Sequence, residues 1–171
     1  MYAELLVLRL VHILSAILWL GSGLFTTFFL IPALAGSPAV VGQVMAGLQR
    51  RRLFAVLPTV ALLTILTGLR LLWIDSAGFT SGYFDTGTGK TFANAGLAAI
   101  ISFLLSVLVA RPSAVRAGVI SASLAASPAA PERERLQAEL ERVRRRATVS
   151  SMLGVGLGIL AASGMAIARY V

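Results

Sequence analysis

The sequence contains no cysteine and only one histidine, His12. Without thiols the chain forms no disulfide bond and no thiolate metal site. Charge is also sparse, because charged residues make up 13% of the 171 residues, whereas an ordinary soluble domain has about a quarter. Hydrophobic residues account for 57% and the mean hydropathy is +0.87. This composition indicates a protein embedded in a membrane.

Acidic residues are scarce beside basic ones, with seven Asp and Glu against fifteen Lys and Arg and a formal net charge of +8. No basic-aromatic recognition motif is present, so nucleic acid is not expected as a partner. In membrane proteins arginines mark the cytoplasmic loops. Here they gather in the first and third connections between apolar segments, at Arg50–Arg52, Arg111, Arg116, Arg133, Arg135, Arg142 and Arg144–Arg146. This predicts both termini on the non-cytoplasmic side of a bacterial cytoplasmic (inner) membrane.

Four apolar stretches dominate the chain, and a bilayer core is crossed by about 20 apolar residues in a helix. They predict one all-α domain over residues 1–171, a multi-pass four-helix bundle in contact with membrane lipid. The expected membrane helices cover about 5–31, 53–74, 90–110 and 149–168. Arg111-Pro112 is expected to end the third helix. Residues 111–148 should form a cytoplasmic connection, in which a helix from Pro131 runs on into the fourth span.

The first stretch carries the single histidine among polar residues of one helical face. His12, Ser15, Trp19, Ser22 and Thr26 recur every three or four residues, which places them on the same side of a helix. A histidine at membrane depth is costly and by default indicates a functional site. We therefore expect His12 to face the bundle interior. It either binds a ligand there or makes a structural hydrogen bond to a neighbouring backbone group or serine.

Polar and charged residues of different helices are expected at the same depth as His12, near the outer surface. These are Arg70, Lys90, Asn94 and Met165. The alternative is that the cations extend independently to lipid headgroups, which is the favoured interpretation for Arg9 and Arg169.

Several cations beside one imidazole disfavour a bare metal ion. They suit a flat anionic ligand whose metal binds His12 and whose carboxylates meet Arg70 and Lys90. Haem and related tetrapyrroles have this chemistry. With a single histidine in the chain, the second axial position is open, or it is filled by Met165, Met152 or another protomer.

Two parts of the sequence resemble one superfamily. The segment from His12 through Trp19 to Gly21, with Pro32 at the helix end, resembles the first helix of the copper resistance D-like membrane proteins. The second span resembles that of the related HemJ-type protoporphyrinogen oxidases, and the third begins with a lysine where theirs does; the matching residues are Arg52-Leu53-Phe54, Pro58, Thr64, Gly68 and Lys90.

The resemblance implies a haem- or porphyrin-associated membrane redox protein, and, if it is an enzyme, an oxidoreductase of the protoporphyrinogen oxidase type. It implies haem b with His12 as iron ligand and a functional role for Lys90. No catalytic residue is assigned, and the candidate cofactor-binding residues are His12, Trp19, Arg70, Lys90, Asn94 and Met165. Two alternatives stay open: an accessory or assembly subunit of a larger membrane complex or homo-oligomer, and a copper transfer protein.

Overall fold

The computed structural model describes residues 2–34, 38–126 and 129–171, which are helical almost throughout and contain no strand. Within these ranges, four helical segments are long and apolar enough to cross a membrane. They cover Tyr2–Leu34, Leu53–Asp75, Gly87–Ala125 and Ala130–Tyr170. The predicted all-α, multi-pass architecture is confirmed at this level. The first, third and fourth segments are longer than predicted.

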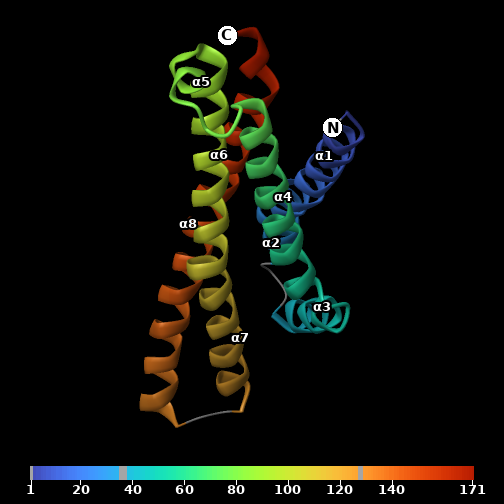
Figure 1. The fold of residues 1–171 in the computed structure, drawn as a ribbon. Helices are drawn as coiled ribbons and strands as arrows, with labels where there is room; N and C mark the ends of the chain where they lie inside the picture. The colour runs from blue at the N-terminus through green and yellow to red at the C-terminus, as the bar shows by residue number, and fades with distance from the viewer. Residues whose placement is uncertain (1, 35–37, 127–128) are drawn as a thin grey trace.

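The first segment is a continuous run of α1 (Tyr2–Phe25), the π-helical turn η1 (Thr26–Leu30) and α2 (Ile31–Leu34). Beyond it lies the short helix α3 (Pro38–Arg50), which runs across the end of α4 (Figure 1). The second span, α4 (Leu53–Asp75), agrees with the predicted 53–74. Its Pro58 lies in the second turn, where few intrahelical hydrogen bonds are lost.

The connection after α4 contains the short helix α5 (Ser81–Asp85) and leads into α6 (Gly87–Leu105). The side chain of Thr86 caps α6 by accepting a hydrogen bond from the Gly89 amide at 3.0 Å. Such a cap satisfies an amide that has no partner in the first turn. The third span was predicted to start at Lys90, and it begins three residues earlier, at Gly87.

The third span also continues past Pro112, through the π-helical turn η2 (Ser106–Ala110) into α7 (Arg111–Ala125). The prediction that Arg111-Pro112 ends the helix is wrong. A proline interrupts a regular helix because it lacks an amide proton and crowds the carbonyl four residues earlier. In η2 the Arg111 amide instead donates to the Ser106 carbonyl, five residues back, which widens the turn just before the proline. The same arrangement, Ile31 to Thr26, precedes Pro32.

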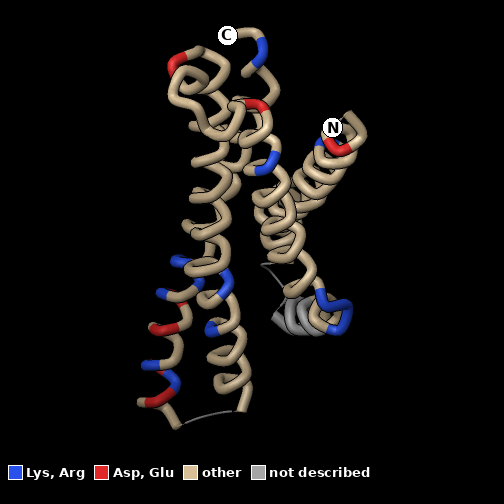
Figure 2. The backbone as a smooth tube through the Cα atoms, viewed as in Figure 1, with Lys and Arg blue, Asp and Glu red and all other residues tan. Residues whose placement is uncertain are grey.

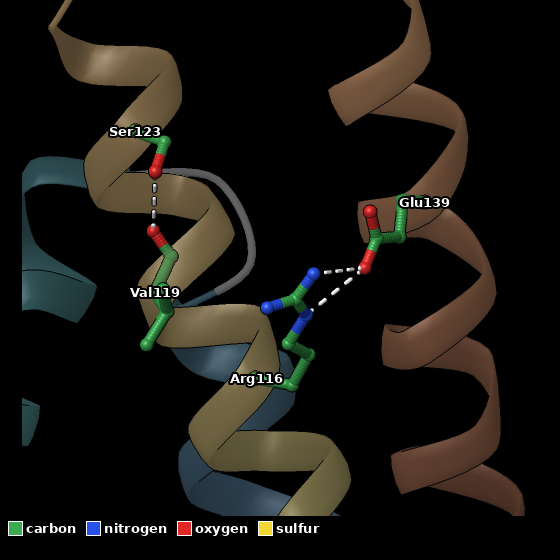
Figure 3. A network of polar contacts seen from close by, with 4 residues as sticks. All are labelled: Arg116, Val119, Ser123 and Glu139. Atoms are coloured by element: carbon green, nitrogen blue, oxygen red, sulfur yellow. Dashed lines mark hydrogen bonds and ion pairs between the residues drawn. The ribbon is translucent and has the colours of Figure 1, made fainter.

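The fourth span is the second half of α8 (Ala130–Ile167), followed by the short 3-10 turn η3 (Ala168–Tyr170). The prediction of one helix continuing from Pro131 into the membrane is confirmed. The first half of α8 packs on α7 as a long hairpin (Figure 1). An ion pair crosses it, since Arg116 donates from Nε and Nη2 to Glu139 Oε1 at 2.9 and 2.7 Å (Figure 3).

The spans pack as two pairs, α1 on α4 and α6 on α8, which are joined by contacts of α4 with α6 and of α1 with α8. Both termini lie at the same end of the molecule (Figure 1), which we call the termini end. Arginines gather at the opposite end, around α3 and the α7–α8 hairpin (Figure 2). The buried contacts use small residues such as Ala61, Ala95 and Ala161, while large apolar side chains face outward. This distribution is typical of helices that pack within lipid.

Candidate functional site

A cavity of about 420 Å³ lies between α1, α4, α6 and α8. Its volume falls within the range of small-molecule sites, about 300–1,000 Å³. The walls are largely apolar and include glycines from each of the four helices: Gly23, Gly68, Gly96, Gly154 and Gly158. Three of the predicted site residues, His12, Trp19 and Met165, line it. The interior orientation expected for His12 is therefore observed.

The imidazole of His12 is held by α4. Its Nδ1 lies 2.8 Å from the Thr64 carbonyl oxygen and 3.3 Å from Thr67 Oγ1. A carbonyl oxygen only accepts, so Nδ1 carries the proton and donates it. In the neutral ring Nε2 then keeps its lone pair. No residue that the structure describes makes a hydrogen bond to Nε2. The structural hydrogen bond weighed from the sequence is thus present, and it leaves the second nitrogen free.

Neighbouring groups fix the ring and the carbonyl that accepts from it. The Thr64 hydroxyl donates to Ser15 Oγ at 2.9 Å, which ties α4 to α1 one turn beyond the histidine. The Ser15 hydroxyl in turn donates to the Val11 carbonyl at 2.6 Å. Gly68 lies directly against the ring, because a Cβ built there would be 2.8 Å from His12 Cε1. The imidazole is therefore closely packed against α4, and position 68 has room only for glycine.

Arg70 does not join His12 at the cavity. Its Nη2 lies 2.6 Å from Glu4 Oε1, and its guanidinium lies over the Trp73 ring at 4.6 Å. Arg70 follows Thr64, whose carbonyl holds His12, by six residues on α4. Each step of three residues turns an α-helix back by about 60°, so two steps move a side chain by about 120°. Arg70 therefore points away from the cavity.

Lys90 and Asn94 are exposed and are not among the residues that line the cavity. The cavity side of α6 is formed by Phe92 and Gly96, each two residues further along the helix. Two residues correspond to about 200° of rotation. Lys90 and Asn94 therefore lie on the side of α6 that faces away from the cavity.

Charged residues at the termini end of the cavity were not among the predicted site residues. Arg9, Asp75 and Arg169 all line it. Asp75 is engaged, since its Oδ2 accepts a hydrogen bond from the Tyr83 hydroxyl at 2.6 Å. Burial, followed by this hydrogen bond, raises the pKa of Tyr83 above its ordinary value. The position of Arg9 at the cavity could have been predicted from the sequence, because Arg9 precedes His12 by three residues and so shares its helical face.

The donor set fits a metal that brings most of its ligands with it. The described residues contain no group of three or more His, Cys, Asp or Glu that could hold a metal ion. A porphyrin already supplies four nitrogens to its iron and needs from the protein an axial ligand, such as one imidazole. Comparisons with models of protein families, with curated proteins and with solved structures gave no match, and no family assignment follows from them.

Proposed function

We propose that this protein is a haem- or porphyrin-associated membrane redox protein of the copper resistance D/HemJ superfamily, with His12 as the axial ligand of the iron. The observation that carries the proposal is the hydrogen bond from Nδ1 to the Thr64 carbonyl, at 2.8 Å, at the wall of a cavity of about 420 Å³. Histidines that bind metals almost always donate their other ring N–H to a carbonyl, carboxylate or water. The donation fixes the tautomer and makes Nε2 a better ligand.

The cavity walls support a flat apolar ligand. They are largely apolar, and Gly96 adds no side chain to the space, since a Cβ built there would meet nothing within 4 Å. Because the chain has no cysteine, it cannot form the thioether bonds of covalently attached haem, and a haem held without covalent bonds, such as haem b, is the form that we propose. When bound, the iron would supply one-electron redox chemistry. Met165 lines the cavity and Met152 does not, so Met165 is the better candidate for a second axial ligand.

The proposal places the arginine-rich end of the bundle in the cytoplasm of a bacterium. Both termini, Arg9 and the cavity mouth then lie toward the outer leaflet of the inner membrane. The support is the accumulation of Arg around α3 and the α7–α8 hairpin (Figure 2), together with the preference of arginine for cytoplasmic loops. Redox partners would therefore reach the cavity from the outer half of the membrane.

An absorption spectrum of the detergent-purified protein, as isolated and after addition of haemin, tests the proposal. We expect a Soret band in the wild type and its loss or marked shift in His12→Ala. Lys90→Gln is the matched control, because Lys90 is exposed and does not line the cavity, and it should keep the wild-type spectrum. Absence of any haem band in the wild type after reconstitution would refute the proposal.

A non-catalytic accessory subunit is the second candidate, and the α7–α8 hairpin favours it. At about 1.5 Å per residue the 38 residues of α8 extend about 57 Å, well beyond a hydrocarbon core of about 30 Å. Val115 and Val119 are exposed one turn apart on α7 within this extension. Co-purification in fixed stoichiometry with a partner and without pigment would favour this function over the first.

A further inference from the structure

Two arginines from opposite ends of the described chain line the cavity near the termini end. Arg9 lies on α1 and Arg169 on η3, and both line the cavity that His12 also lines. Neither has a carboxylate within 4.0 Å among the described residues, whereas Arg70 and Arg116 each form an ion pair. The cavity mouth thus presents guanidinium groups whose hydrogen-bond donors are available to a ligand.

The acidic residues near the mouth only partly balance the charge of these arginines. Asp75 lines the cavity, but its Oδ2 is engaged by the Tyr83 hydroxyl at 2.6 Å. Glu4, near the start of α1, is engaged by Arg70 at 2.6 Å. Two cations therefore face one carboxylate at the mouth, and that carboxylate already accepts a hydrogen bond. A bound anion would gain from this arrangement, and a neutral ligand would not.

Resting on the proposed function, we propose that Arg9 and Arg169 bind the carboxylates of the tetrapyrrole. The ligand class is then a tetrapyrrole dicarboxylate, held with its acidic edge toward the termini end and its ring beside His12. Arg9 precedes His12 by three residues, so it lies about 4.5 Å further out along the same helical face. Guanidinium binds carboxylate through two parallel hydrogen bonds, which fixes orientation as well as affinity. This pair replaces Arg70 and Lys90 in the role expected from the sequence.

The competing explanation is that both arginines extend to phospholipid headgroups. The two explanations differ in what a substitution does to ligand affinity. Removing a headgroup contact leaves binding in the cavity unchanged. Removing a carboxylate contact weakens binding of the diacid and leaves binding of a neutral ligand, such as its dimethyl ester, unchanged.

The natural tryptophans of the chain allow ligand binding to be followed by fluorescence. Of its two tryptophans, Trp19 lines the cavity and Trp73 lies outside it beneath Arg70. In a Trp73→Phe background, quenching of Trp19 fluorescence reports a ligand in the cavity. The titration uses iron-free protoporphyrin IX and its dimethyl ester, in nanodiscs of phosphatidylcholine alone and with added phosphatidylglycerol. The variants are Arg9→Gln and Arg169→Gln, with Lys90→Gln as the control cation at the same end.

We expect each arginine variant to raise the Kd for protoporphyrin IX by about tenfold or more, the effect of losing one hydrogen-bonded charge. The ester should bind the wild type and the variants equally weakly, and Lys90→Gln should match the wild type in both lipids. Unchanged Kd values in Arg9→Gln and Arg169→Gln, or an equal loss in Lys90→Gln, would overturn the inference.

The outcome also separates this inference from the proposed function. A His12-dependent Soret band without arginine dependence keeps the function and removes the arginine role. Arginine-dependent binding of the iron-free ligand, without any effect of His12→Ala on the haem spectrum, keeps the arginine role and removes the axial ligand. If no tetrapyrrole quenches Trp19, both are wrong.

Discussion

Replacing Gly68 by alanine changes the packing around the His12 imidazole without substituting His12 itself. The added Cβ would lie 2.8 Å from His12 Cε1 and 3.3 Å from Nδ1, whereas ordinary van der Waals contact begins at about 3.4 Å. The ring must therefore shift, and its 2.8 Å hydrogen bond to the Thr64 carbonyl lengthens or breaks. We expect haem binding to weaken in consequence, because the imidazole no longer presents Nε2 to the cavity in a fixed direction.

Three contributions determine the change in the free energy of unfolding, two of them unfavourable and one favourable. Overpacking a close-packed interior costs about 1–3 kcal/mol, and the weakened hydrogen bond about 0.5–1.5 kcal/mol. Alanine gains about 1 kcal/mol over glycine in a helix. The free energy of unfolding should therefore fall by about 2 kcal/mol. The Kd for haem should rise about tenfold or more, since a ligand displaced by a few tenths of an ångström loses much of its bond to the metal.

Gly21→Ala is the matched control, because it lies on the same helix as His12 and a Cβ there would meet nothing within 4 Å. It should be neutral or stabilising and should leave haem binding unchanged. Thermal unfolding in detergent measures stability in both variants, and titration with haemin measures affinity. If Gly68→Ala behaves like Gly21→Ala in both assays, the close packing of the imidazole against α4 is refuted.

Further predictions concern the groups around the cavity and the hairpin. Thr64→Val removes the hydroxyl that donates to Ser15 and keeps the carbonyl that holds His12. The free energy of unfolding in detergent should therefore fall by about 0.6–1.7 kcal/mol, and haem binding should be retained. Loss of the haem spectrum would contradict this prediction. Glu139→Gln breaks an ion pair that is partly exposed, and chemical unfolding should show a loss of about 0.2–1 kcal/mol that disappears at high salt. The raised pKa of Tyr83 stabilises the fold below pH 10, and this contribution should be lost as the pH rises above about 10, where the unfolded phenol ionises first. Tyr83→Phe should remove that alkaline dependence, and an unchanged pH profile would count against the Asp75 hydrogen bond.

The sequence was sufficient to predict the four apolar helices and the inward face of the first, because both follow from hydropathy and residue spacing. It was not sufficient to predict that the third helix passes Pro112. That outcome depends on the five-residue hydrogen bond from Arg111 to Ser106, a backbone choice that leaves no composition signal.

Residue spacing alone was also not sufficient to predict which charged residues line the cavity. Arg70 was expected near His12 because the two lie at the same depth, but its rotation about the axis of α4 turns it to Glu4. Arg169 lies at the cavity because η3 follows the long helix α8 at the termini end, a position that depends on tertiary packing. Arg9 could have been found from its phase relative to His12.

The single histidine allows a direct measurement of the ring nitrogens. With ¹⁵N-labelled histidine in a detergent-solubilised sample, every ring signal comes from His12. Our account predicts that Nδ1 is protonated and Nε2 is not, and that haem changes or broadens the Nε2 signal while the proton on Nδ1 is retained. A proton on Nε2 in the neutral ring, or an Nε2 signal that haem leaves unchanged, would contradict it.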